Sequence, residues 1–203
     1  MKLYGDLLSP FVRMSLVTAL ECGLGTRVQL VSTLVKPQEA NPVLTRLSPI
    51  GKVPALETDH GHPLYDSRVI MEYFCHVAGN KVLLADDGAK HFKVLTLLAL
   101  AQGMGDAAVA LRYETFARPQ EARWADLANR LRQRVSACMD EMELHWLELL
   151  GEVNLGTIAA AVVLGYIDLR ELAPDWRKTR MGLARWHEAF SKRESMVNTV
   201  PRT

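Results

Sequence analysis

The sequence predicts two domains, an α/β domain in about the first 80 residues followed by an all-α domain. Two observations carry this prediction. Short apolar runs alternate with helical patterns up to Gly79, and no convincing strand pattern follows that residue. Strands that alternate with helices favour a sheet covered by helices, whereas continuous helical periodicity favours a bundle. At about 100–200 residues per domain, the chain suits two small domains or one large one.

The first domain reads as a βαβ unit followed by a ββα unit. The predicted elements of the first unit are a strand at 2–5, a helix at 11–24 and a strand at 27–31. A loop-rich stretch with one short helix follows. The predicted elements of the second unit are strands at 53–58 and 63–65, joined by a turn at 59–62, and a helix with Ile70, Phe74 and Val77 on one face. This order predicts an α/β sandwich over residues 1–80.

The second domain, residues 87–203, follows a linker predicted at Asp86-Asp87-Gly88. Helices are predicted at about 90–117, 120–150, 155–168 and 178–192. In the second of these, apolar residues recur at spacings of three and four, which is typical of the buried stripe of a bundle helix. These residues are Leu127, Leu131, Val135, Met139, Met142, Trp146 and Leu149.

Composition excludes several classes of protein. The chain has 24 Lys and Arg against 23 Asp and Glu, a net charge of +1, and residues 1–80 carry seven of each sign. A nucleic-acid-binding protein normally has a basic excess. The longest apolar run, residues 158–164, is much shorter than the roughly 18 residues of a membrane span, and Asp6 and Pro10 interrupt any signal-peptide core. We therefore expect a cytoplasmic protein that binds neither nucleic acid nor membrane.

Cysteine and histidine patterns do not predict a metal site. Cys22, Cys75 and Cys138 are more than 50 residues apart and form no CxxC motif, so we expect reduced and mostly buried thiols. His60 and His62 occupy a predicted turn with no Cys or carboxylate at ligand spacing. A metal site needs three or four ligands.

Ser9-Pro10 closes the first predicted strand and opens the first helix. Ser favours the N-cap and Pro the first helical position, so the pair marks a helix start. Two interpretations stay open. The Ser9 hydroxyl only caps the helix, or it faces a ligand anion beside the backbone N–H groups at the positive end of the helix.

Two further pairs lie at strand ends. Val53-Pro54 follows Gly51, and a cis bond there would leave the Val53 N–H and C=O free for an extended peptide. Asp66-Ser67 opens the last helix of the domain, where we expect Ser67 to be the N-cap and Asp66 to hold an ammonium group. Local structure alone also explains each pair. Together with Ser9, they predict an anion-binding hydroxyl, an open backbone edge and an amino-acid clamp in one small domain.

Three segments carry a resemblance to a known family: SPFVR at 9–13, NPVLTRLSPIGKVPAL at 41–56 and YDSRVIMEYF at 65–74. They strongly resemble the N-terminal domain of glutathione S-transferases, in which a thioredoxin-like α/β domain precedes an all-α helical bundle. Residues 154–159 and 164–168 are similar to the family's buried core helix and its N-cap, and residues 186–195 to its last helix. The resemblance covers essentially the whole chain.

The resemblance implies a role for each matching residue of the first domain. Ser9 matches the position where the family has a catalytic Ser or Cys near the glutathione sulfur. Val53 precedes the position of the family's cis-proline, Pro54, and its backbone would pair with the cysteinyl part of glutathione. Asp66 and Ser67 match the pair that binds the γ-glutamyl amino and carboxylate groups.

Other substrate contacts are expected from two regions. Lys36 and Lys52 lie where some members of the family hold the glycyl carboxylate. The helical domain would supply an apolar pocket, with Met104, Tyr113 and Phe116 as candidates. The resemblance thus implies a bacterial-type glutathione S-transferase, a cytoplasmic homodimer that conjugates glutathione to a small hydrophobic electrophile in detoxification, without a metal.

The sequence departs from the family's pattern at two places, and two alternatives stay open. Ser9 replaces Cys, so mixed-disulfide chemistry loses its nucleophile. Asn154 and Thr157 replace the Ser/Thr and Asp that often begin the core helix, which keeps a cap and loses a carboxylate. The alternatives are a binding or interaction protein that kept the fold without catalysis, and a glutathione-dependent peroxidase, reductase or isomerase.

Overall fold

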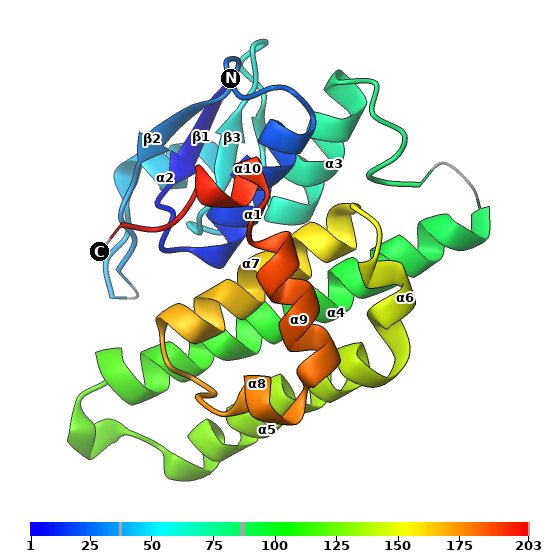
Figure 1. Ribbon diagram of the computed structural model, residues 1–203. Helices are drawn as coiled ribbons and strands as arrows, with labels where there is room; N and C mark the ends of the chain where they lie inside the picture. Colours follow the sequence, from blue (N-terminus) through cyan, green and yellow to red (C-terminus); the bar gives the residue numbers. More distant parts are fainter. Residues whose placement is uncertain (37, 86–87, 203) are drawn as a thin grey trace. The chain divides into compact units, whose positions relative to one another are not determined.

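The computed structural model describes residues 1–36, 38–85 and 88–202. The chain divides into two compact units, Met1–His91 with Glu194–Thr203, and Phe92–Arg193. The first unit contains a small mixed sheet with helices, and the second is helical (Figure 1). The predicted fold class, an α/β domain followed by an all-α domain, is therefore confirmed. Of the predicted linker, Asp86 and Asp87 lie outside the described residues.

A four-stranded sheet forms the centre of the first unit, in the order β2-β1-β3-β4. The strands are β1 (Lys2–Gly5), β2 (Gln29–Ser32), β3 (Ala55–Glu57) and β4 (Pro63–Leu64). β1 pairs in parallel with β2, whereas β3 runs antiparallel to both β1 and β4. The register places Leu3 beside Leu30 and Leu56. Each predicted strand is present: the first has the predicted bounds, and the bounds of the others differ by at most two residues.

Two helices of this unit cover the same face of the sheet. They are α1 (Pro10–Glu21) and α3 (Ser67–Val77); a third helix, α2 (Pro42–Leu47), lies between β2 and β3 in the chain. Leu3 and Leu56 of the sheet are buried in one cluster with Val12 of α1 and with Ile70 and Phe74 of α3. Burial of apolar surface against these two strands therefore holds α1 and α3 on the sheet, and with them the residues at the helix N-termini.

β1 and α1 approach each other closely at Gly5. The φ angle of Gly5 is +152°, and a Cβ at this position would lie 2.3 Å from Cγ2 of Val12. Only glycine fits such a conformation and such a contact without strain. The close approach determines where the chain turns from β1 into α1, and therefore where Ser9 lies.

The last residues of the chain contact α1. α10 (Glu194–Val197) belongs to the first unit by its contacts, whereas the predicted boundary at residue 87 assigns it to the helical domain. Arg13 is only 8% exposed and donates from Nη2 to the Met196 carbonyl (3.1 Å) and from Nε to Oγ1 of Thr199 (3.4 Å). Burial lowers the pKa of Arg13. These contacts attach the C-terminal segment to the first unit.

The expectation of one last helix over residues 186–195 is wrong. α9 (Met181–Phe190) ends before that range does, and α10 starts anew at Glu194. The amide groups of Ser191 and Arg193 bond to carbonyls of the last turn of α9, at His187 and Phe190, which closes that helix. The periodic pattern predicts a helix at about 178–192, which ends before α10 begins, so only the expectation taken from the resemblance extends across the break.

The second unit is built from helices of very different length. Its remaining elements are α4 (Gly88–Arg112), which begins in the first unit, the π-helical turn η1 (Tyr113–Ala117), the 3-10 turn η2 (Gln120–Ala122), α5 (Ala125–Glu141), the π-helical turn η3 (Met142–Trp146), α6 (Leu147–Leu150), α7 (Leu155–Leu169) and α8 (Trp176–Thr179). The helix predicted at 120–150 is thus divided into several segments. On its apolar stripe the central residues, Leu131, Val135, Met139 and Met142, are buried.

α7 is the core of the helical unit, because almost all of its residues are buried. Its N-terminus is a capping box in which Oδ1 of Asn154 accepts from the Thr157 amide (3.0 Å) and Oγ1 of Thr157 accepts from the Asn154 amide (2.8 Å). Asn154 and Thr157 depart from the family's pattern, but together they form both hydrogen bonds of a capping box. A Cβ on Gly156 would lie 2.8 Å from Cβ of Leu97 and 3.0 Å from the Val94 carbonyl oxygen, so α4 and α7 touch at this glycine.

One helical stretch among the described residues, Gly88–Ala117, is long and apolar enough to cross a membrane by length and composition. Half of its most apolar segment is buried inside the structure, as for the core helix of a folded domain.

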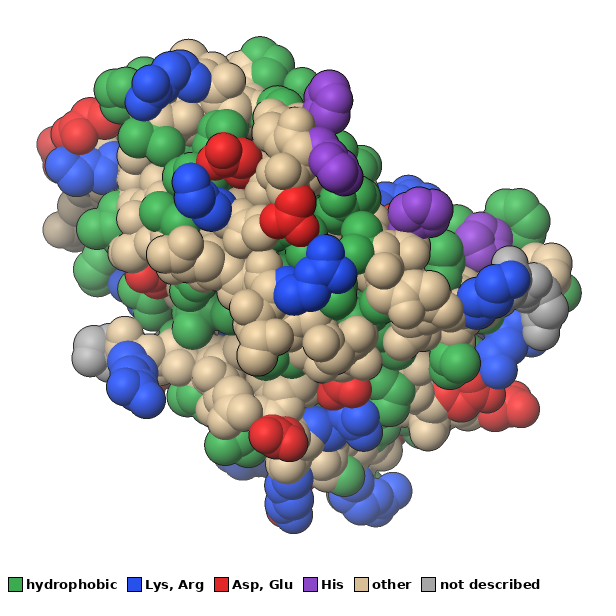
Figure 2. Space-filling view, turned by 90° about the horizontal axis from the view of Figure 1, so that it is seen from above, with side chains coloured by type: hydrophobic (Ala, Val, Ile, Leu, Met, Phe, Trp, Pro, Cys, Tyr) green, Lys and Arg blue, Asp and Glu red, His purple; other side chains and the backbone are tan. Residues whose placement is uncertain are grey.

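On the face that Figure 2 shows, acidic and basic side chains are interspersed.

We predict that Gly156→Ala destabilises the helical unit, because the added methyl group has to displace backbone and Cβ atoms of α4. Overpacking of this kind costs about 1–3 kcal/mol of unfolding free energy. Gly103→Ala is the matched control: it lies in α4, and a Cβ there meets no atom within 4 Å. This control should be neutral or stabilising by up to about 1 kcal/mol. Urea unfolding followed by circular dichroism measures both, and equal stability of the two variants would contradict the contact of α4 with α7.

Candidate functional site

Three chain segments meet at one edge of the sheet in the first unit. This edge is the side of the sheet on which strands begin and end, not an outermost strand. β1 ends, β3 begins and β4 ends at this edge, because β3 is antiparallel to both neighbours and its first residue, Ala55, pairs with Tyr4 of β1. Ser9, Val53 and Asp66 lie just outside these strand ends. The sheet therefore brings together three residues that the sequence analysis selected separately.

Ser9 is the N-cap of α1. Its backbone is extended, Pro10 is the first helical residue, and Oγ accepts a hydrogen bond from the Val12 amide (3.4 Å). Among the described residues none accepts the hydroxyl hydrogen, and the side chain is half-buried. A serine hydroxyl has one donor and two acceptor positions. Capping uses an acceptor position and leaves the donor available, so the two interpretations of Ser9 are compatible.

The Val53–Pro54 peptide bond is cis. Val53 is half-buried and lies outside the strand, since β3 begins at Ala55. Neither its N–H nor its C=O has a hydrogen-bond partner among the described residues. Unpaired backbone groups at a sheet edge can bind an extended peptide as an added strand. Pairing with a cysteinyl group stays a prediction.

Asp66, not Ser67, is the N-cap of α3. Oδ1 of Asp66 accepts from the Arg68 amide (3.0 Å), and its carbonyl accepts the first helical bond from Ile70 (3.0 Å). The expectation that Ser67 caps the helix is wrong because Ser67 is already helical and only 2% exposed. Cap preference alone does not distinguish the two residues, since Asp and Ser are equally good caps.

The Asp66 side chain combines a capped helix start with an exposed charge. The Tyr65–Asp66 peptide bond is also cis. Among the described residues, no group bonds to Oδ2 of Asp66, so this oxygen can accept from a ligand ammonium group while Oδ1 caps α3. The backbone N–H groups at the start of α3 provide partial positive charge for a ligand carboxylate beside it.

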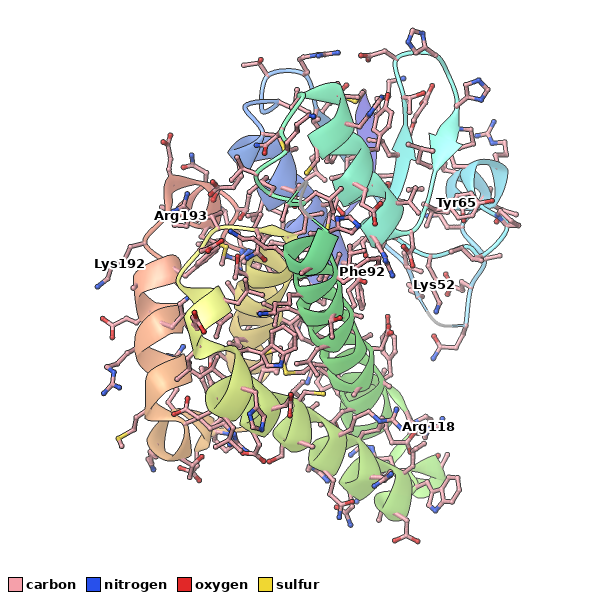
Figure 3. All side chains as sticks on the ribbon, turned by 90° about the vertical axis from the view of Figure 1, so that its right-hand side faces the viewer. Lys52, Tyr65, Phe92, Arg118, Lys192 and Arg193 are labelled. Atoms are coloured by element: carbon pink, nitrogen blue, oxygen red, sulfur yellow. The ribbon has the colours of Figure 1, made fainter. Side chains whose placement is uncertain are left out.

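The two candidate lysines differ in their surroundings. Lys36 forms an exposed ion pair with Glu39 (3.0 Å), so its charge is partly compensated. Lys52 is exposed and has no carboxylate partner among the residues that the structure describes. Figure 3 labels Lys52, on the loop before β3, and Tyr65, where the chain leaves β4. Of the two lysines, Lys52 is the one whose charge is free for an anion.

The three electrophile candidates in the helical unit are not equally exposed. Met104 has no exposed surface, whereas Tyr113 is 42% and Phe116 65% exposed. Tyr113 and Phe116 lie on η1, and the Arg112 guanidinium carbon is 3.4 Å from the centroid of the Phe116 ring. The assignment of all three to a binding pocket stays a prediction. The sequence analysis did not consider Arg112.

In the part of the chain that the structure describes, no group of three or more His, Cys, Asp and Glu side chains could hold a metal ion. The groups of the site described above are hydroxyl, backbone, carboxylate and ammonium groups. Such groups bind and orient a ligand with both an amine and a carboxylate.

Comparisons with known proteins agree with this geometry. The family model described as glutathione S-transferase, N-terminal domain, matches residues 8–77, a range that includes Ser9, Val53 and Asp66. A relative from Escherichia coli (strain K12), named "Uncharacterized GST-like protein YibF", is 33% identical over 204 residues, which cover 99% of this chain and 98% of the relative.

Solved structures cover the whole chain. A glutathione transferase family member from Pseudomonas fluorescens Pf-5, with bound glutathione, is 34% identical with a TM-score of 0.96, over 100% of this chain and 99% of the other. A structure from the same organism with bound S-(propanoic acid)-glutathione is 33% identical with a TM-score of 0.91, over 100% of both chains. Given identity above 30% over nearly its entire length and the matching first domain, the chain belongs to the glutathione S-transferase family.

Proposed function

We propose that this protein is a glutathione transferase, which joins the sulfur of glutathione to an electrophilic carbon. The observation that carries the proposal is the edge of the sheet at which Ser9, Val53 and Asp66 meet. A hydroxyl donor, an unpaired backbone segment and an exposed carboxylate there complement the thiol, the peptide and the ammonium group of glutathione. Ser67 and Lys52 would bind its two carboxylates, and Lys36 would assist once released from Glu39.

In this proposal Ser9 acts on the charge of the thiol. A free thiol has a pKa of about 8.5, so little thiolate exists at pH 7. A hydrogen bond from the Ser9 hydroxyl and the positive N-terminal end of α1 both favour the thiolate and lower the pKa of the thiol. The thiolate sulfur then attacks the electrophilic carbon, and the leaving group departs with the bonding electron pair. Ser9 forms no covalent bond.

The bound molecules in the two P. fluorescens structures support this choice of substrate. One holds glutathione, and the other holds glutathione whose sulfur carries a propanoic acid group. An S-substituted glutathione is the kind of product that a conjugation reaction forms. In this chain, Tyr113, Phe116 and Met104 of the helical unit are the proposed electrophile contacts.

Two measurements separate the proposal from its alternatives. A non-catalytic binding protein would show no turnover with any electrophile. If calorimetry detects no glutathione binding at millimolar concentration, the proposal of a glutathione transferase is contradicted. A substrate panel with peroxides, disulfides and isomerisable substrates distinguishes conjugation from the other glutathione-dependent reactions.

We further propose that the protein is cytoplasmic, has a role in detoxification and forms a homodimer. For the homodimer, gel filtration should give about twice the chain mass of 22.7 kDa.

We predict that Ser9→Ala lowers turnover with an aryl halide by about 10- to 100-fold, the value of one hydrogen bond to a charged group. Glutathione affinity should change little, and the pKa of the bound thiol, followed by thiolate absorbance, should rise towards that of free glutathione. Ser9→Gly is the control for capping, because glycine at an N-cap costs only a few tenths of a kcal/mol. Unchanged turnover in both variants would show that Ser9 is only a cap.

We predict that Asp66→Asn weakens glutathione binding about tenfold or more, because an amide does not attract the ammonium group as a carboxylate does. Asn caps helices as well as Asp does, so the unfolding free energy should stay within about 1 kcal/mol of that of the unmodified protein. Asp66→Ala should lower both affinity and stability. Calorimetry and urea unfolding measure the two properties, and full affinity in Asp66→Asn would limit Asp66 to capping.

A further inference from the structure

Two arginines lie at the same end of the helical unit. Gly156 of α7 touches α4 at Val94 and Leu97, and Figure 1 shows α4 and α7 side by side and running in the same direction. Both helices rise about 1.5 Å per residue. Fourteen residues beyond Gly156, α7 reaches Arg170. Fourteen residues beyond Val94 and Leu97, α4 reaches residues 108–111, next to Arg112. The helices therefore place both arginines at their C-terminal ends.

Neither arginine has a carboxylate partner among the described residues. Three other arginines of the same unit do: the pairs are Arg118–Glu114 (2.8 Å), Arg177–Asp168 (2.5 Å) and Arg180–Asp140 (2.7 Å). In Arg170, moreover, Nε is buried and has no hydrogen-bond partner. A buried donor without an acceptor is unfavourable. Arg170 is therefore held with a donor position open.

The two guanidinium groups are close enough to repel each other. Burial lowers the pKa of Arg112, and the positive charge of Arg170 lowers it further. The negative end of α7 attracts the Arg170 cation, whereas the chain continues from Arg112 into the π-helical turn η1. Two neighbouring positive charges without an anion form a site that a bound anion would stabilise.

Aromatic rings surround the pair. The Arg112 guanidinium carbon lies 3.4 Å from the Phe116 ring centroid, and that of Arg170 lies 5.7 Å from the centroid of Tyr166. Tyr166 is only 7% exposed, whereas Tyr113, next to Arg112 in the chain, is 42% exposed. Stacking on Phe116 uses the face of the Arg112 guanidinium and leaves its edge donors available. Arg170 hydrogen-bonds to the side chain of Tyr166, and its buried Nε has no partner. The planar fork of a guanidinium matches the two oxygens of a carboxylate.

We propose that Arg112 and Arg170 bind a carboxylate of the electrophile, while Phe116 and Tyr113 contact its apolar part. This inference rests on the proposed transferase function and narrows its substrate class, from a small hydrophobic electrophile to an amphipathic one with an anionic group. Arg112 and Arg170 are then specificity-determining residues that do not touch the reacting sulfur.

The test compares 4-chloro-3-nitrobenzoate with its methyl ester, which keeps the ring and the leaving group but removes the charge. Arg112→Gln and Arg170→Gln should each lower kcat/KM at least about tenfold more for the acid than for the ester, with most of the loss in KM. Arg170→Lys should restore part of the loss, since it keeps the charge without the fork. Arg132→Gln, an exposed arginine on α5, is the control and should change neither substrate. Equal losses for acid and ester would overturn the proposal.

Direct binding separates failure of this inference from failure of the proposed function. Fluorescence titration with 4-chloro-3-nitrobenzoate, without glutathione, should show binding that the two Gln variants weaken about tenfold or more. If the protein turns over neither substrate but binds the acid in this arginine-dependent way, the transferase proposal fails and the anion site stands. If binding of the acid is the same in all variants, the anion site is excluded.

A second and independent observation concerns two cysteines of the first unit. Cys22 follows the last residue of α1 and Cys75 lies in the last turn of α3, and their Sγ atoms are 4.0 Å apart. Both thiols are free; Cys22 is half-buried and Cys75 is 2% exposed. The contact lowers the pKa of Cys22, and the same contact together with burial raises the pKa of Cys75. Cys22 is thus the more accessible of two adjacent thiols.

We infer that Cys22 and Cys75 form a reversible disulfide by exchange with a small disulfide such as oxidised glutathione. The Cys22 thiolate attacks one sulfur of that molecule, forms a mixed disulfide and releases one glutathione thiolate. The Cys75 sulfur, losing its proton to solvent, then attacks the Cys22 sulfur and releases the second. The protein is oxidised by two electrons, and one oxidised glutathione becomes two reduced molecules.

Mass spectrometry after incubation with oxidised glutathione tests this reaction. The unmodified protein and Cys138→Ser should each lose two hydrogen atoms and two titratable thiols, reversibly with dithiothreitol. Cys75→Ser should stop at one bound glutathione, and Cys22→Ser should not react. Retention of all three thiols in the unmodified protein, or reaction of Cys22→Ser to the same extent, would overturn the inference.

Discussion

The pairing of β3 with β1 on one side and β4 on the other determines where the chemistry of the first unit lies. Because both pairs are antiparallel, the end of β1, the start of β3 and the end of β4 share one edge of the sheet. Gly5 permits the close approach that directs the chain from β1 into α1 at this edge. Ser9, Val53 and Asp66, the central residues of the proposed glutathione site, depend on this register.

Capping and binding share the same side chains at this edge. Ser9 caps α1 through a lone pair and keeps its hydrogen, and Asp66 caps α3 through one oxygen and exposes the other. Each side chain is thus oriented by the helix that it starts, before any ligand is present. Orientation by a rigid element reduces the entropy that binding would otherwise cost. Helix stability and ligand binding therefore favour the same residues at these two positions.

Net charge says little about the charges that matter in this protein. The total of +1 conceals a carboxylate available at the sheet edge and two arginines without acidic partners in the described part of the helical unit. Three other arginines of that unit, Arg118, Arg177 and Arg180, are paired with carboxylates within about 3 Å. At the proposed sites this charge lies close to residues selected from the sequence: the carboxylate is that of Asp66, and Arg112 precedes Tyr113 in the chain.

The sequence by itself determined the features that local physics controls: the two-domain fold class, the helix starts at Ser9-Pro10 and Asn154, and the motifs that identify the family. Caps, turns and apolar periodicity involve residues close in the chain, so they are visible in one sequence. Tertiary structure alone decided that Asp66 rather than Ser67 caps α3, that Arg13 holds residues 183 and 186 positions away, and that Cys22 meets Cys75 across 53 positions. Such contacts follow from how sheet and helices pack, and no spacing in the sequence records that packing.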